Sequence, residues 1–191
     1  MTGVGAVSNG ARRRPRNRVR LAASLALLGA SGALLVACGE ASKADGPANP
    51  NATVVRVVDG DTIVADVRGT EERVRLIGID TPESVKPDSP VECFGKEASA
   101  HAKELLPEGT PVLLVLDTEE RDRYGRLLAY VYRAEDRRFI NLAMVEDGYA
   151  NQYTFPPNVA HAEEFRAAAS KARSEGIGLW SACRENNPFD D

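Results

Sequence analysis

The sequence predicts an α+β fold in which a small five-stranded β-barrel is combined with three helices. Three runs of β-branched or alternating residues come before the first segment of helical composition. Two strongly apolar runs follow that segment, and two further helical segments come near the end of the chain. Because strands and helices do not alternate one by one, the order disfavours a parallel βαβ sheet.

Three strands are expected at the start of the folded region. Residues 53–58 and 62–67 are β-branched runs on either side of Asp59-Gly60-Asp61. Residues 68–70 read Arg-Gly-Thr and predict a hairpin turn. Residues 72–79 alternate in polarity and predict the third strand.

A proline-rich loop is expected over residues 81–92, before a helix at 95–106 that stops at Pro107. The remaining elements are two apolar strands and two helices, at 111–116, 126–132, 140–146 and 159–175. Five strands with a helix between the third and fourth are consistent with a Greek-key barrel of the oligonucleotide-binding (OB) type. The two histidines are expected to be solvated helix residues, and Trp180 to seal a core.

Charge is unevenly distributed along the chain. Residues 1–37 hold six arginines and no acid, whereas the remainder holds 18 basic and 28 acidic residues, a net charge of −10. An acidic domain does not attract nucleic acid by its bulk charge, so a phosphate-binding site has to be built locally. Only two histidines in the chain argue against a histidine-rich metal site.

The basic and apolar N-terminal segment predicts export. Residues 12–20 are arginine-rich, and residues 21–37 are uncharged and end in small residues before Cys38. Leu-Val-Ala-Cys at this position resembles the lipobox of bacterial lipoproteins, whose cysteine is lipidated. We therefore expect a lipoprotein signal peptide over 1–37 and lipidation of Cys38. An uncleaved signal anchor is the alternative. Consecutive arginines at 12–14 raise the twin-arginine export route, although the residues after them match its usual pattern poorly, so the choice between that route and general secretion stays open.

The rest of the chain divides into a tether and one domain. Residues 38–51 are rich in Gly, Ala, Ser, Pro and Asn, as flexible linkers are, and the folded domain is expected over 52–191. With Cys38 assigned to lipid, Cys93 and Cys183 remain as an even pair in an oxidising compartment, which predicts a disulfide. Two independent buried thiols are the alternative.

Three clusters of charged residues could carry chemistry. The first is residues 59–62, Asp-Gly-Asp-Thr, and the second is residues 73–83, a strand with two arginines on one face that ends in acids. The third is residues 122–126, with an aromatic residue between two arginines. Carboxylates suit Ca²⁺, guanidinium groups match a phosphodiester, and a further carboxylate can take a proton from water. Together they predict phosphodiester hydrolysis.

These clusters also carry a family resemblance. From about residue 53 to 180 the chain resembles staphylococcal nuclease, the thermonuclease family, in the ordered stretches VVDGDTIV, VRLIGIDTPE, FGKEAS, DRYGRLLAYVY and GLWS. The resemblance implies an OB-type barrel with three helices. It also implies Ca²⁺-dependent hydrolysis of DNA and RNA that leaves a 3′-phosphate.

The resemblance implies a role for each matching position. Asp61 and Asp80 correspond to metal carboxylates, and Thr81 to a residue that offers its main-chain oxygen to the metal. Asp59 lies next to that metal site. Three further residues correspond to the catalytic groups: Glu83, the candidate general base or water-orienting residue, and the phosphate-clamping Arg75 and Arg126.

Substrate-flanking positions match less closely. Arg123 replaces a family lysine, and Tyr124 is retained. Tyr153 falls at a position that stacks on a base, and Phe155 stands where the reference nuclease has a tyrosine, in a segment one residue shorter. Stacking survives the loss of a hydroxyl group, but a hydrogen bond to phosphate does not.

The sequence as a whole predicts an exported, membrane-tethered, calcium-dependent endonuclease. It would act as a monomer on DNA, with RNA as a second candidate substrate, and would face outward from the cell membrane on a lipid anchor. A noncatalytic binding module on the same barrel is the alternative, and the complete set of matching acids and arginines argues against it. An acidic lipoprotein that binds an envelope polymer or calcium is a more distant alternative.

Overall fold

The structure is a computed structural model that describes residues 49–84 and 90–190, all within the unit Ser42–Asp191. The predicted signal peptide, Cys38 and most of the predicted tether lie outside the described residues. Within the described ranges, no helix is both long enough and apolar enough to cross a bilayer.

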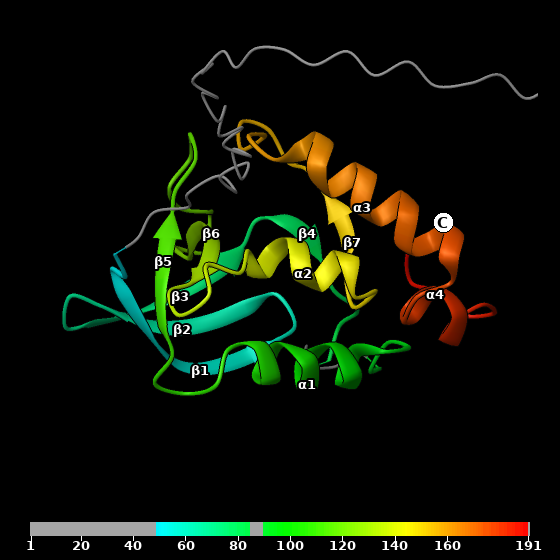
Figure 1. The fold of residues 1–191 in the computed structure, drawn as a ribbon, viewed down its shortest axis with the longest axis horizontal. Coiled ribbons are helices and arrows are strands. Elements are labelled where there is room, and N and C mark those ends of the chain that lie inside the picture. The colour runs from blue at the N-terminus through cyan, green and yellow to red at the C-terminus, as the bar shows by residue number, and fades with distance from the viewer. Residues whose placement is uncertain (1–48, 85–89, 191) are drawn as a thin grey trace, which may run out of the picture. The chain divides into compact units, whose positions relative to one another are not determined.

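Five strands close into the barrel that the sequence predicts (Figure 1). Their order around the barrel is β1-β2-β3-β6-β5, and a short antiparallel pairing of Ala52 with Val112 and Thr53 with Pro111 closes it. The strands are β1 (Ala52–Asp59), β2 (Thr62–Val67), β3 (Thr70–Leu76), β5 (Pro111–Val115) and β6 (Leu127–Arg133). The predicted hairpin turn joins β2 to β3, with Arg68 and Gly69 both at positive φ, as in the turns that match strand twist.

The third strand ends earlier than its polarity pattern predicts. β3 stops at Leu76, and residues Gly78–Asp80 form a separate strand, β4. β4 pairs with β7 (Asn151–Tyr153), a strand that the sequence analysis did not predict. Gly78 explains the break, because its φ of +84° suits glycine and a Cβ there would come within 2.2 Å of the Phe165 ring. The chain can therefore leave the barrel at this residue.

β3 and β6 form a parallel pair within the otherwise antiparallel barrel. Val74 pairs with Leu127 in this register, and Arg75 with Leu128. Residues distant in sequence, at the end of β3 and the start of β6, thereby become neighbours.

A buried asparagine fixes this pair of strands. Asn141 is fully buried, and its Oδ1 accepts a hydrogen bond from the Val131 N–H at 2.9 Å. Its Nδ2 donates to the carbonyls of Ile77 at 2.9 Å and Ala129 at 3.2 Å. Because these partners belong to β6 and to the residue that follows β3, Asn141 ties the two segments together.

The described part of the chain holds four helices, of which α1 and α2 pack on strands of the barrel. α1 packs against β1, and α2 lies between β6 and α3 (Figure 1). α3 begins three residues later than predicted, and a fourth, single-turn helix follows it. The helices are α1 (Gly95–Leu105), α2 (Ile140–Glu146), α3 (Ala162–Glu175) and α4 (Leu179–Ala182).

A small apolar cluster lies under α4, apart from the barrel core. Trp180 seals it, as the sequence predicts, with 8% of its surface exposed. Phe94 and Ile177 pack against the same cluster. The structure joins Cys93 to Cys183 in this cluster by a disulfide, with Cα atoms 5.9 Å apart.

Candidate active site

Residues from the first two charged clusters, together with the second arginine of the third, line one polar cavity of about 230 Å³. The β1–β2 turn, β3, the end of β4 and the residue before β6 all contribute to it. The lining residues are Asp59, Asp61, Thr62, Arg75, Asp80, Thr81, Pro82, Glu83 and Arg126. The structure thus brings together every residue that the sequence analysis proposed for metal binding and for catalysis.

Asp61 anchors the loop that follows β4. Its side chain is buried, and Oδ2 accepts hydrogen bonds from both the backbone N–H and the hydroxyl of Thr81, each at 3.1 Å. The other oxygen accepts the Thr62 hydroxyl at 3.0 Å. Gly60 allows this approach, since a Cβ there would lie 2.8 Å from the Thr81 side chain. The predicted metal residues Asp61 and Thr81 therefore form one rigid unit.

Arg75 carries the positive charge between the two predicted metal carboxylates. It forms ion pairs with Asp61 and with Asp80, the latter at 2.8 Å, and its Nη2 also donates to the Ile79 carbonyl at 3.0 Å. Burial lowers the pKa of the Arg75 guanidinium, and the Asp80 carboxylate opposes that fall.

Burial also acts on the acids of the cavity. It raises the pKa of Asp59 and of Asp80, while the charge of Arg75 opposes the rise in both. Their ionised forms are therefore less well solvated than in water, and a further cation in the cavity would stabilise them.

The donors in the cavity suit a hard cation. Asp61 and Asp80 offer carboxylate oxygens, the ligands that Ca²⁺ prefers, and Thr81 can add a main-chain oxygen. Within residues 49–84 and 90–190, no three His, Cys, Asp or Glu side chains form a ready-made metal cluster. A calcium ion here would rely on the two carboxylates, the peptide oxygen and water, as the sequence predicts. The residues fit the ion in charge and in donor type.

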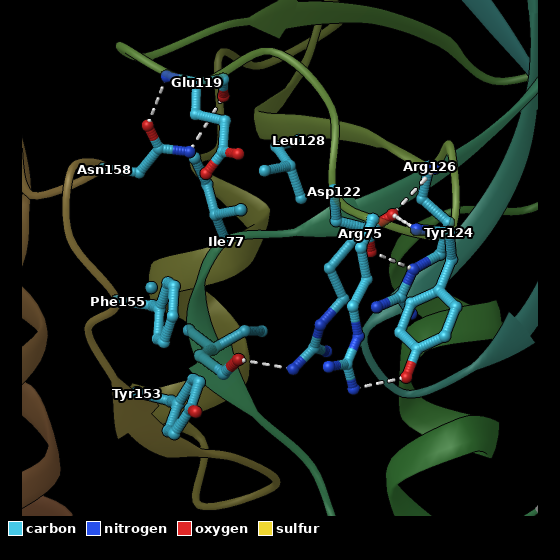
Figure 2. A pocket seen from close by; sticks show the side chains of 13 residues that line it. Arg75, Ile77, Glu119, Asp122, Tyr124, Arg126, Leu128, Tyr153, Phe155 and Asn158 are labelled. Carbon is cyan, nitrogen blue, oxygen red and sulfur yellow. Dashed lines mark hydrogen bonds and ion pairs between the residues drawn. The ribbon is translucent and has the colours of Figure 1, made fainter.

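Arg126 is held at the cavity by an acid to which the sequence analysis gave no role. Its Nε donates to Asp122 Oδ2 at 2.7 Å, and its backbone N–H donates to Asp122 Oδ1 at 2.9 Å (Figure 2). Burial alone would raise the pKa of Asp122, but these hydrogen bonds lower it. Because Asp122 occupies Nε, the other edge of the guanidinium remains for a ligand. The sequence signal that could have revealed this ion pair was the spacing, an acid four residues before an arginine.

Glu83 lines the cavity in the segment that follows β4. Its Oε1 accepts a hydrogen bond from the Ser84 N–H at 2.9 Å. Its own backbone N–H donates to Glu92 Oε2 at 2.8 Å. The predicted base is thus half-buried beside the carboxylate cluster, and its backbone is fixed from a residue nine positions later.

A second, larger cavity of about 420 Å³ adjoins the first, and Arg75 and Arg126 line both. Figure 2 shows Tyr124 near Arg126 and Asp122, and Tyr153 and Phe155 on another wall. The rings of Tyr153 and Phe155 are nearly parallel, with centroids 6.5 Å apart. The remaining lining residues are Ile77, Gly78, Ile79, Glu119, Arg123, Leu128 and Asn158.

The aromatic side chains of this second cavity are exposed to solvent. Tyr124 is 69% exposed, and Phe155 is 65% exposed. The Arg123 side chain lies over the Tyr124 ring at 4.7 Å and donates to its hydroxyl at 2.5 Å. All four residues that the sequence predicts to flank the substrate therefore line one open cavity with flat, exposed rings.

Two polar residues that the sequence analysis missed, one of them in the lining of this cavity, fix the segments around it. Asn158 exchanges hydrogen bonds with the backbone of Glu119, at 2.8 and 2.9 Å. Asp117 Oδ2 accepts the Tyr130 hydroxyl and the Ala160 N–H, both at 3.0 Å. They tie the loop after β5 to the segment before α3. Neither residue stands in a recognisable pattern, so the sequence held no signal for them.

Comparison with known proteins assigns the fold and the motifs to one family. A family model described as "Staphylococcal nuclease homologue" matches residues 73–182. Thermonuclease of Staphylococcus intermedius is 40% identical over 144 residues, which cover 71% of this chain and 84% of that protein. Thermonuclease of Staphylococcus hyicus is 41% identical over 128 residues, 67% of this chain and 74% of that protein.

A relative outside the staphylococci shares the same region. Endonuclease YncB of Bacillus subtilis (strain 168) is 38% identical over 132 residues, which cover 69% of this chain and 62% of that protein. The family-model match, residues 73–182, begins within β3 and runs to the end of α4. The chain therefore belongs to the family of staphylococcal nuclease homologues.

Proposed function

We propose that the chain is a calcium-dependent nuclease that hydrolyses phosphodiester bonds of DNA and RNA and leaves 3′-phosphate ends. One observation supports this most directly. Arg75 and Arg126 stand where a cavity of carboxylates meets a cavity of exposed aromatic rings. A nucleotide lying across that junction would place its phosphate at the arginines and its base against the rings.

The two arginines would stabilise the phosphate as it reacts. Negative charge grows on the phosphoryl oxygens in the transition state, and planar guanidinium groups match those oxygens with two donors each. Asp122 holds Arg126 through Nε, so its remaining donors are already oriented. Such prior orientation means that little reorganisation is needed at the moment of reaction.

Glu83 would act on the attacking water. Glu83 lines the cavity that holds Asp61 and Asp80, and its carboxylate can accept a proton from water or orient the water toward phosphorus. Asp61, Asp80 and Thr81 would hold the calcium ion, which when bound would supply Lewis-acid polarisation of the phosphate.

Base contacts in this proposal depend on stacking. Tyr124, Tyr153 and Phe155 present exposed rings, and stacking on such rings tolerates any base. The domain is acidic apart from its arginine sites, so we expect binding to depend on a few local phosphate contacts rather than on long-range attraction.

Digestion of single-stranded DNA by the purified full chain tests the proposal. We expect cleavage with Ca²⁺ and its loss with EDTA. The product ends should resist tailing by terminal transferase until a phosphatase removes a 3′-phosphate. Binding of single-stranded DNA with no cleavage at any Ca²⁺ concentration would favour the noncatalytic binding module instead.

Export and membrane attachment complete the proposed function. Residues 1–37 would act as a lipoprotein signal peptide, 38–51 as a tether and 52–191 as the nuclease domain, a monomer facing outward from the cell membrane. The support is the basic and apolar leader that ends at Cys38. Two acyl chains on Cys38, each buried CH₂ contributing about 0.8 kcal/mol, would hold the protein stably in a bilayer.

Metabolic labelling tests the lipid anchor. A fatty-acid probe fed to an expressing bacterium should label the wild-type chain and leave Cys38→Ala unlabelled. Cys93→Ser serves as the control, because this cysteine lies in the folded domain and its loss should leave labelling intact. Equal labelling of wild type and Cys38→Ala would show that Cys38 is not the lipidation site.

A further inference from the structure

The backbone of Glu83 is bonded to Glu92 at two points. The Glu83 N–H donates to Glu92 Oε2 at 2.8 Å, and the Glu92 N–H donates to the Glu83 carbonyl at 3.0 Å. Glu92 therefore forms hydrogen bonds with both the backbone N–H and the carbonyl of Glu83. A shift of Glu92 would therefore move the Glu83 backbone.

The start of α1 packs directly on the same peptide. The Gly95 N–H donates to the Glu92 carbonyl at 3.1 Å, and a Cβ on Gly95 would lie 2.5 Å from the Glu83 carbonyl oxygen. Only glycine allows this approach without displacing Glu83. Residues 92–95 therefore form the surface on which Glu83 is held.

A disulfide joins this surface to the C-terminal part of the chain. Cys93 directly follows Glu92, and it is bonded to Cys183, the residue that caps α4. Phe94 and Cys93 pack against the apolar cluster of Trp180 and Leu179. The Cys93–Cys183 bond spans 90 residues, so it links the loop carrying Glu83 to a part of the chain that is remote in sequence.

We propose that Glu92 is a positioning residue for Glu83, and that the Cys93–Cys183 disulfide keeps Glu92 in the place where it can do so. The inference rests on the proposed nuclease function, in which Glu83 orients or deprotonates the water. Its consequence is that turnover depends on the redox state of the chain. The enzyme works fully after oxidation and poorly while both thiols are reduced.

Kinetics of the purified full chain on single-stranded DNA test the redox dependence. Reduction with a phosphine should lower kcat roughly 10- to 100-fold, the loss that a small misplacement of a catalytic group causes. KM should change little, because Arg126 and the rings of the larger cavity lie in the loop before β6 and in and just after β7, not in the loop of Glu83. Far-ultraviolet circular dichroism of the reduced chain reports whether the fold persists.

A Glu83→Gln background separates positioning from general loosening. If the disulfide acts through Glu83, reduction of this variant should lower its residual kcat by less than two-fold, because the group being positioned is already disabled. An equal loss in wild type and Glu83→Gln would overturn the inference. A folded, reduced wild type that keeps its kcat would overturn it as well.

Variants of Glu92 decide the question with the disulfide intact. Glu92→Ala should lower kcat at unchanged KM, whereas Glu92→Gln, which keeps a side-chain oxygen for the Glu83 N–H, should restore most of it. Glu97→Ala removes an exposed acid from the first turn of α1 and is the matched control. Wild-type kcat in Glu92→Ala would overturn the inference. An oxidised wild type without Ca²⁺-dependent cleavage would overturn the proposed function, and this inference with it.

Discussion

Replacing Arg126 with lysine is expected to lower kcat roughly 100- to 1000-fold, the loss typical when one charge-stabilising donor is removed. Lysine keeps the charge, but its single nitrogen cannot bond Asp122 and a phosphate oxygen with the geometry of a planar fork. The contact strengthens as charge grows on the phosphate, so kcat should fall more than KM rises. Steady-state kinetics on single-stranded DNA across a Ca²⁺ titration measure this, and added Ca²⁺ should not restore the rate.

Arg121→Lys is the matched control for this variant. Arg121 lies in the same loop and also uses its fork, but it binds Glu72 at 2.7 and 2.8 Å and the Gly125 carbonyl at 2.9 Å, outside the described linings of both cavities. Its replacement should leave kcat near that of the wild type. A folded Arg126→Lys protein within a few-fold of wild-type kcat would remove Arg126 from the mechanism.

Asp61→Asn is expected to weaken Ca²⁺ binding by at least roughly 10- to 100-fold, a range found even for groups one step removed from a metal. Asparagine keeps one oxygen that can accept the Thr81 hydrogen bonds, so the loop after β4 should stay in place. Alanine would leave the Thr81 N–H and hydroxyl without their shared acceptor and would remove one of the two acidic partners of Arg75, a cost to stability as well as to binding. Titration calorimetry with Ca²⁺ gives the affinity, and raising Ca²⁺ should partly restore activity.

Asp66→Asn is the control for charge removal. Asp66 lies in β2, and its Oδ1 accepts the Gly69 N–H at 2.6 Å in the hairpin turn, away from the carboxylate cavity. This variant should bind Ca²⁺ as the wild type does. Unchanged calcium affinity in folded Asp61→Asn would mean that Asp61 does not hold the metal.

The barrel was predictable because each of its strands is long enough to show a pattern. Runs such as 62–67 and 111–116 are β-branched or apolar apart from Asp66, and the structure confirms them within one residue. β4 and β7 have only three residues each, too few to display alternation. The break between β3 and β4 depends on how closely Phe165 approaches Gly78, and that contact is not visible in local sequence.

The site residues also divide into those that the sequence could reveal and those that it could not. Asp61, Asp80 and Arg75 stand in motifs with a chemical logic, so they could be selected before any geometry was known. Supporting residues elsewhere in the site could not be selected in this way. Asn158, for example, acts through the backbone of Glu119, which lies beside it only in the folded chain. The histidines show the same limit. His101 was expected in solvent, but its ring stacks on Tyr149 at 4.0 Å and its Nε2 lies 2.9 Å from the Asp147 carboxylate.

Asn141 has a consequence for transferring this activity to other proteins. It lies in α2, and the described residues that line the two cavities include none from that helix. Yet its three hydrogen bonds fix how β6 lies against the end of β3, and hence how Arg126 faces Arg75. Grafting the charged loops onto another five-stranded barrel would carry over the chemical groups without the buried hydrogen bonds that set the position of the two strands. A designer who wants the chemistry has to transplant the amide in the core together with the loops.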